Sequence, residues 1–223
     1  MRTIDGYNTQ VSDTPFETAS LLSQVLWITT VGFLFTAFGA WIAPPVLGFG
    51  YMLLILLNFG LIFAISAAAR RSSGLALVLF YVFTTFMGVE ISPILNQYMH
   101  SLAGQHIVLE AAVTTALGMA VIAVVAEFSR FNYMKVGRIA FFALIGLVVV
   151  GLLGAFVHIV SPGMYAWMSL AVFSLLLLVD FMRLKNQGRL YGPVQMSLSI
   201  YLDALNIFLA LLQIFGGGSR SRD

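Results

Sequence analysis

Cysteine is absent from this chain of 223 residues, so neither a disulfide nor a thiolate metal site can form. Charged residues are also scarce, at 9% of the sequence, whereas a soluble domain carries about 25%. Hydrophobic residues make up 60% of the chain, and its mean hydropathy is +0.97. A soluble fold of this size could not bury so much apolar surface. The composition therefore predicts a protein whose solvent is the lipid bilayer, and the net charge of +2 is too small to indicate nucleic-acid binding.

Seven apolar segments are long enough to cross the membrane as helices. A helix needs about 20 residues to span the hydrocarbon core of about 30 Å, and six of the segments exceed that length while the segment at residues 164–182 nearly reaches it. Runs such as residues 140–157 and 170–179 are apolar on every face, unlike the alternating strands of a membrane barrel. The sequence therefore predicts an all-α, polytopic membrane protein with seven transmembrane helices, at residues 21–42, 46–69, 75–98, 107–128, 138–160, 164–182 and 194–215.

The segments divide the chain into three parts. A polar N-terminal segment, residues 1–19, precedes a transmembrane domain at residues 20–216, and residues 217–223 form a flexible tail. The start is unlike a signal peptide, because an acidic stretch and not a basic one leads into the first apolar run. The connections between spans are short, so helices adjacent in sequence are expected to be antiparallel neighbours.

The distribution of Lys and Arg predicts the orientation of the chain in the membrane. Loops on the side of the N-terminus hold most basic residues, and the three loops on the other side hold none. Cytoplasmic loops carry the excess of Lys and Arg, so the N-terminus is predicted to be cytoplasmic and the C-terminus outside. Arg220 and Arg222 in the tail disagree with this orientation, because it places them outside. A re-entrant last segment, which would place them inside, is an alternative. The basic residues on the N-terminal side are Arg2, Arg70, Arg71, Arg130, Lys135, Arg138, Arg183, Lys185 and Arg189.

Ionisable side chains within the spans cost about 2.5–3.5 kcal/mol each on insertion scales, so each needs an explanation. Glu127 is one turn from Arg130 at a span end, which favours an interfacial ion pair. His158 is near the outer end of the fifth span, where solvation at the interface accounts for it. Glu110 is one turn into the fourth span, where it can reach the interface or cap the helix start.

Glu90 is well inside the third span, three residues before Pro93. A proline frees a backbone carbonyl and can kink the helix. A carboxylate beside freed carbonyls would suit a cation or a proton, whereas a buried pair with an arginine would be purely structural. Both interpretations stay open at this point.

Asp203 is the ionisable group most clearly within the membrane. It is nine residues into the last span, which is about 14 Å at 1.5 Å per residue. Ser199 and Asn206 are four residues before and three residues after it, so the three share one helix face. That face must look into the protein, because lipid offers these groups no hydrogen-bond partner.

Asp180 has two interpretations. It is one turn before Arg183 near the end of the sixth span, which favours an interfacial ion pair. The sixth and seventh spans are antiparallel neighbours, so Asp180 could instead contact Asp203. Two carboxyl groups in contact share a proton and titrate as a unit, which would make a pH-sensitive latch. Counting along the predicted spans leaves Asp180 about 10 Å nearer the surface than Asp203, which favours the ion pair.

Several segments resemble one known family. Residues 197–208, SLSIYLDALNIF, and residues 211–216, LLQIFG, closely resemble the C-terminal motif of the Bax inhibitor-1 (transmembrane Bax-inhibitor-motif) family, as found in bacterial members. Gly88, the run Ser92-Pro93-Ile94 and Tyr98 resemble the third-span pattern of that family. The segment around Asp180 matches its sixth-span aspartate, and Arg70 with Arg71 matches its basic second loop. The resemblance covers residues 20–216 in spacing.

The resemblance implies more than the composition does. It implies seven spans with the last helix surrounded by the others, and a pH-sensitive calcium leak in the bacterial inner membrane. It also implies that Asp180 and Asp203 are the proton-sensing pair, with Arg70 or Arg71 as a latch partner. One departure concerns Asn58, which stands about where some calcium-leaking members have a glutamate. Glu90 is not part of the family pattern.

We therefore expect a passive, pH-gated cation leak that carries calcium. Calcium prefers carboxylate and carbonyl oxygens. The gate and ion ligands are expected at Asp180 and Asp203, and further oxygen ligands along the path at Glu90, Glu110 and Asn206. The partners are then lipid, calcium ions and protons, with no cofactor. Enzymatic activity is not expected, because the chain has no GxGD motif and no obvious Ser/His pair.

The alternative function is a membrane interaction protein that modulates a membrane protease or a stress response without conducting ions. The polar N-terminal segment would be its contact surface. A third function, a proton-coupled transporter, would need a substrate cavity that the sequence does not locate.

Deletion of residues 1–18 separates the first two functions. A leak should keep its calcium flux in reconstituted liposomes, because the deleted segment precedes the spans. A docking role should instead fail, which a co-purification assay with the membrane protease would detect. Loss of flux together with unchanged docking would contradict the leak.

Overall fold

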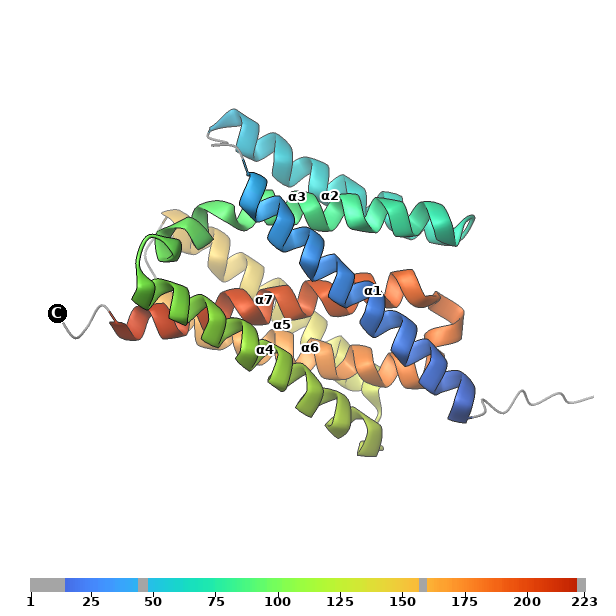
Figure 1. Ribbon diagram of the computed structural model, residues 1–223. Coiled ribbons are helices and arrows are strands. Elements are labelled where there is room, and N and C mark those ends of the chain that lie inside the picture. The colour runs from blue at the N-terminus through green and yellow to red at the C-terminus, as the bar shows by residue number, and fades with distance from the viewer. Residues whose placement is uncertain (1–14, 44–47, 157–159, 220–223) are drawn as a thin grey trace, which may run out of the picture.

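The computed structural model describes residues 15–43, 48–156 and 160–219, and within them seven long helices follow one another (Figure 1). The first fourteen residues, His158 and the last four residues lie outside the described part. All seven helices are long and apolar enough to cross a membrane. They are α1 (Pro15–Ile42), α2 (Phe49–Ala69), α3 (Ser73–Met99), α4 (Leu102–Phe128), α5 (Tyr133–Phe156), α6 (Pro162–Tyr191) and α7 (Pro193–Ser219).

Side-chain caps explain where several helices begin. Ser72, Ser101 and Ser161 each accept a hydrogen bond from the backbone N–H three residues on, at the starts of α3, α4 and α6. Asn132 accepts from the backbone N–H of Lys135 at the start of α5. Each of these residues supplies an acceptor to a backbone donor that has none within the helix.

The prediction for the sixth span was wrong at its C-terminal end. Residues 164–182 were expected, but α6 continues to Tyr191 and ends at Gly192, whose φ of 75° favours glycine. Residues 183–190 include two arginines, a lysine, a glutamine and two leucines, all good helix formers, which outnumber the less favourable Asn186 and Gly188. A helix can leave the hydrocarbon and continue in water. The stop signal is Gly192 followed by Pro193, the usual end of a helix, and not the change in polarity.

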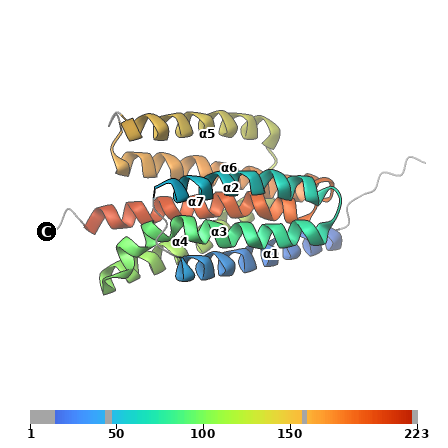
Figure 2. The ribbon, with the colours of Figure 1, turned by 90° about the horizontal axis from the view of Figure 1, so that it is seen from above.

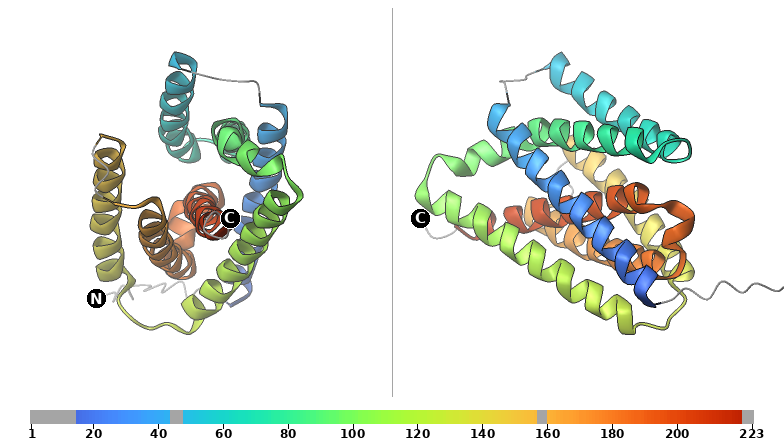
Figure 3. Two further views of the ribbon diagram at one scale, coloured as in Figure 1. Left: turned by 90° about the vertical axis from the view of Figure 1, so that its left-hand side faces the viewer. Right: turned by 45° about the vertical axis from the view of Figure 1, so that its right-hand side comes forward.

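The last helix is the centre of the bundle, as expected. Buried residues make up 56% of the α7 span, against 11% of the α4 and α5 spans. Close backbone contacts connect α7 to α1, α2, α3, α4 and α6, whereas within the described residues α5 makes such contacts with α6 alone. The end-on view in Figure 3 shows α7 enclosed by the other helices, and Figure 2 shows α5 at the edge of the bundle beside α6.

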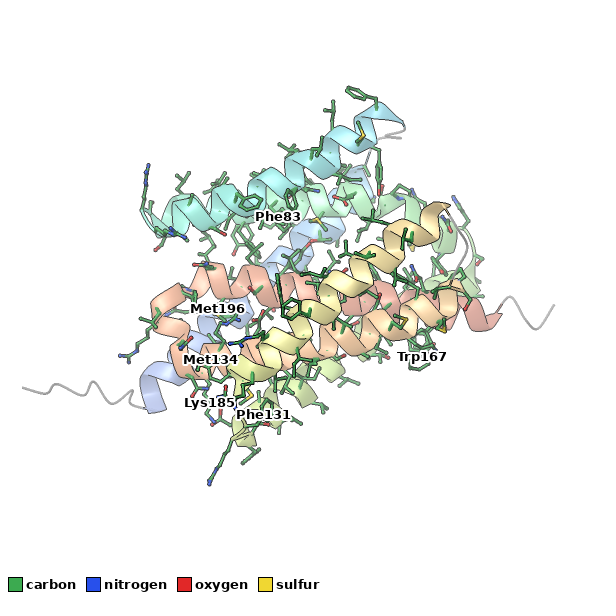
Figure 4. The ribbon with its side chains drawn as sticks, turned by 180° about the vertical axis from the view of Figure 1, so that it is seen from behind. Phe83, Phe131, Met134, Trp167, Lys185 and Met196 are labelled. Carbon is green, nitrogen blue, oxygen red and sulfur yellow. The ribbon has the colours of Figure 1, made fainter. Side chains whose placement is uncertain are left out.

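Large apolar side chains cover the outside of the bundle. Trp41, Leu117 and Leu152 are among the many exposed ones. Figure 4 shows Trp167 projecting away from the helices. Such a surface is stable only in lipid, which agrees with an integral membrane protein.

Small residues bring α1 and α3 into close contact. A methyl group on Gly39 would collide with the carbonyl of Thr85, and one on Gly88 would collide with the carbonyl of Thr36. The two glycines are therefore placed reciprocally where the backbones cross. Close packing of small residues is a usual means of helix association in lipid.

Tyr201 ties α7 to this crossing. Its ring packs against Phe33, Phe80 and Phe83. Its hydroxyl lies 2.6 Å from the hydroxyl of Thr36, which itself donates to the carbonyl of Gly32 at 3.0 Å. Because the hydrogen of Thr36 is used in that way, Tyr201 is the donor. The bond fixes the central helix to α1 within the buried core.

We predict that Gly88→Ala destabilises the protein by about 1–3 kcal/mol, because the added methyl overpacks the crossing against Thr36. Denaturation in mixed detergent micelles measures the effect. Gly118→Ala is the matched control, since its added methyl meets no atom within 4 Å apart from the local backbone of its own helix. A loss of stability no larger for Gly88→Ala than for Gly118→Ala would contradict the close crossing.

Candidate functional site

Asp180 is buried in the middle of α6, with 8% of its surface exposed. Its Oδ1 accepts a hydrogen bond from Arg183 Nη1 at 3.0 Å, one turn further along the same helix. The guanidinium of Arg183 also lies over the ring of Tyr191, 5.8 Å from its centroid. The ion pair expected from the spacing of the two residues is therefore present.

Asp203 lies on α7 next to this ion pair and is 7% exposed. It interacts electrostatically with both Asp180 and Arg183, and Ser199 is within hydrogen-bonding reach of Asp180. The Oδ2 atom of Asp203 is buried and has no hydrogen-bond partner among the described residues. We refer to Asp180 and Asp203 as the aspartate pair. Asp180 therefore has both Arg183 and Asp203 as neighbours. The ion pair and the contact between aspartates, which the sequence offered as alternatives, occur together.

The predicted difference in depth between the two aspartates was wrong. Asp180 is eleven residues before the end of α6 at Tyr191, and Asp203 is ten residues after the start of α7 at Pro193. At 1.5 Å per residue these distances are about 16 Å and about 15 Å. The extension of α6 beyond residue 182 therefore brings Asp180 to the level of Asp203.

This arrangement suits proton exchange. Two buried carboxylates side by side repel each other, so one proton shared between them lowers the energy of the pair. Arg183 supplies one positive charge, which can balance one of the two negative charges. A second proton or a cation can bind at the unpartnered Oδ2 of Asp203. The pair is therefore chemically able to respond to pH or to a cation.

The expected latch partners lie elsewhere. Arg70 and Arg71 are exposed in the turn after α2. Neither forms an ion pair within the described part of the chain. Arg183 is the basic residue beside the aspartate pair. The latch role of Arg70 or Arg71 stays a prediction.

Glu90 belongs to a second polar cluster, between α2 and α3. Its Oε2 accepts a hydrogen bond of 2.6 Å from Nδ2 of Asn58, and its main-chain oxygen accepts one of 3.1 Å from the hydroxyl of Tyr51. Asn58 is 3% exposed, and its Oδ1 has no partner in the described part of the structure. The purely structural role considered for Glu90 required a buried arginine as its partner. The partner is instead the side-chain amide of Asn58.

Pro93 affects the helix near Glu90 less than expected. It lies inside α3, which continues to Met99. Proline removes the usual donor to the carbonyl four residues before it, which is that of Val89. The hydroxyl of Ser92 donates to this carbonyl at 2.9 Å. The carbonyl is therefore satisfied and is not a free ligand.

The other predicted residues are separate from the aspartate pair. Glu110 is exposed on α4, and Ser101, not Glu110, caps the start of that helix. Asn206 is partly buried on α7 and donates to the carbonyl of Leu202 in its own helix, at 2.8 Å. Their place in an ion path stays a prediction.

Glu127 was expected to pair with Arg130 but pairs with Lys185. The distance from Lys185 Nζ to Glu127 Oε1 is 3.2 Å, and Nζ also donates to the main-chain oxygen of Glu127. The helix α4 ends at Phe128, so Arg130 is no longer one turn away on the same helix face. The extended α6 brings Lys185 to this place at the end of the bundle (Figure 4).

The aspartate pair was also expected to bind a metal ion. Within the described residues, no group of three or more His, Cys, Asp or Glu side chains comes together. The pair thus offers two carboxylates, where a calcium ion takes six to eight oxygen ligands. Such a site would suit a passing ion better than a resident one.

Comparison with known proteins agrees with the fold. A family model described as "Inhibitor of apoptosis-promoting Bax1" matches residues 18–221. An uncharacterized membrane protein of Streptococcus pyogenes is 30% identical over 70% of this chain and 69% of its own length. An uncharacterized protein of Helicobacter pylori is 31% identical over 71% of this chain, and the chain spans about two thirds of it, 66%.

A third relative is similar over more of its length. The inner membrane protein YbhL of Escherichia coli is 29% identical over 87% of this chain and 90% of its own length.

We predict that Asn58 and Glu90 stabilise each other across the interface of α2 and α3. Hydrogen bonds between membrane helices average about 0.6 kcal/mol, and those to charged groups are stronger, about 1.5–3 kcal/mol in general. A double-mutant cycle with Asn58→Ala and Glu90→Ala should therefore give a coupling energy of about 1–2 kcal/mol. Unfolding in mixed detergent micelles measures it. Additive effects of the two substitutions would show that the contact contributes nothing.

Proposed function

Because this chain belongs to the Bax inhibitor-1 family of membrane proteins, we propose that it is a pH-sensitive calcium leak of the bacterial inner membrane, gated by the aspartate pair. One observation carries this proposal. Asp180 and Asp203 are buried at the same depth on neighbouring antiparallel helices, and one carboxylate oxygen of Asp203 has no partner among the described residues.

The protonation of the pair would set its state. With a shared proton, Asp180 and Asp203 attract each other and hold α6 against α7, the two helices that pack along most of their length. Loss of that proton leaves two negative charges beside the single charge of Arg183. The carboxylates then repel each other. Higher pH is therefore expected to loosen α6 from α7 and to open the path.

Oxygen atoms for a calcium ion are available at several depths. The aspartate pair supplies carboxylates on α6 and α7. Towards the side of the C-terminus, Glu90 supplies a carboxylate and Asn58 an unpartnered amide oxygen. An ion that moves between such groups is bound by few ligands at a time, which suits passage. Glu110 and Asn206 remain candidates for further ligands.

The orientation belongs to the same proposal. Arg70 and Arg71 follow α2, Lys135 is in the first turn of α5, and Arg189 is in the last turn of α6. These positions are all at the end of the bundle where α1 begins. The excess of positive charge supports a cytoplasmic N-terminus. The aspartate pair would then lie about 15 Å from the cytoplasmic ends of α6 and α7.

We predict that wild-type protein in liposomes passes more calcium as the pH rises from about 6 to about 8, because the pair loses its proton. Asp203→Asn and Asp180→Asn should each remove this rise. An amide is neutral at every pH and resembles the protonated acid, so the flux should stay at the low-pH level. A fluorescent calcium indicator inside the liposomes measures the flux.

Glu127→Gln is the matched control for this experiment. It also neutralises a carboxylate, but one that pairs with Lys185 at the end of the bundle. It should keep the pH dependence of the wild type. Equal pH dependence of wild type, Asp203→Asn and Asp180→Asn would refute gating by the pair. No flux in any of them would refute the leak itself.

A further inference from the structure

An apolar groove lies between α1 and α4 and is unrelated to the aspartate pair. These two helices make no close backbone contact in the described part of the chain. In Figure 1, α7 is visible in the space between them. The groove has a volume of about 480 Å³, and α3 and α7 form its floor through Ile91, Leu95, Leu205 and Phe208.

The walls of the groove consist almost wholly of hydrocarbon. Leu26, Phe33 and Leu34 line it from α1, and Val108, Ala112 and Met119 line it from α4. Four threonines also line the groove: Thr29, Thr30, Thr36 and Thr115.

Two of these threonines are satisfied within their own helices. Thr36 donates to the carbonyl of Gly32, and Thr115 donates to that of Ala111. Thr29 Oγ1 is buried and has no partner among the described residues, so an occupant does not reach it. Thr30 is exposed. The walls therefore offer an occupant the side chain of Thr30 and otherwise apolar contacts.

The position and length of the groove indicate that lipid chains can enter it. Its lining spans residues 26–37 of α1 and 108–119 of α4, well inside both membrane spans. Eleven steps of 1.5 Å make the groove about 16 Å long. The hydrocarbon core is about 30 Å thick, so the chains of one leaflet extend over about 15 Å. The groove thus has the length of a lipid chain and opens where lipid chains are.

A helix from another protein or from a second copy is the alternative occupant. A helix with side chains is at least 10 Å across, whereas an unbranched hydrocarbon chain needs less width.

We propose that the groove between α1 and α4 binds one acyl chain of a membrane phospholipid, which reaches through the outer helices to the central helix α7. The chain contacts Leu205 and Phe208, on the helix that carries Asp203. The phospholipid then acts as a bound ligand and not only as solvent. The proposal does not depend on ion conduction.

Tryptophan fluorescence tests the proposal. The three tryptophans, Trp27, Trp41 and Trp167, are exposed to lipid, so all three are first replaced with phenylalanine. A single tryptophan is then introduced by Phe208→Trp, and the protein is placed in vesicles of phosphatidylcholine with brominated acyl chains. Bromine quenches tryptophan only at short range. We expect quenching comparable to that of a variant that keeps only Trp27.

Two variants provide the matched controls. Phe83→Trp, made in the same tryptophan-free background, places the probe at a fully buried position that does not line the groove, so it should escape quenching. Ala116→Phe fills the groove from α4 and should protect the probe of Phe208→Trp, whereas Ala143→Phe on the outer face of α5 should not. Quenching of Phe208→Trp no greater than that of Phe83→Trp would overturn the proposal. Quenching unchanged by Ala116→Phe would overturn it as well.

Lipid retention gives a second readout that needs no tryptophan substitution. Wild-type protein, purified in mild detergent from vesicles of phosphatidylcholine, should keep more phospholipid by mass spectrometry than Ala116→Phe does. Ala143→Phe should keep as much as the wild type. Equal retention by all three proteins, or a self-association that Ala116→Phe abolishes, would mean that something other than an acyl chain fills the groove.

Discussion

Hydrocarbon offers polar side chains no hydrogen-bond partner, and this constraint governs the arrangement of the whole bundle. The last helix carries Ser197, Ser199, Tyr201, Asp203 and Asn206, so it is stable in the membrane only when other helices enclose it. Five helices do so, and the apolar helix α5 can remain outside. A span that carries several polar side chains is thus also the most buried one, in contrast to a soluble protein.

The number of spans could be predicted from the sequence, because the length of an apolar segment does not depend on the other segments. The burial of Asp203 could also be predicted, from its position deep in the last span and from the polar residues on the same helix face. The end of α6 could not be located by hydropathy, because helical structure continues after the hydrocarbon ends. Gly192 and Pro193 were the better signal. Nine residues of additional helix changed the depth of Asp180 and the partner of Glu127.

Contacts between helices were the least predictable part of the site. Spacing along one helix suggested the pair of Asp180 and Arg183, and it is present. Asn58 and Glu90 are 32 residues apart, on different helices. Their contact depends on the rotation of α2 about its axis, which hydropathy does not determine for a helix that is apolar on nearly every face. The resemblance to a family indicated which aspartates come together, and the structure adds Arg183 beside them.

Tyr201 and Asp203 are two residues apart on α7 and face different neighbours. Tyr201 is held by three phenylalanine rings and by the hydroxyl of Thr36, so α7 cannot turn about its axis without breaking its attachment to α1. The proposed separation of the aspartates would therefore require α6 to move while α7 stays in place. Among the described residues α5 makes close backbone contact only with α6, so α5 would move with it. The contacts of α6 with α1 and α4, including the ion pair of Lys185 with Glu127, would have to break.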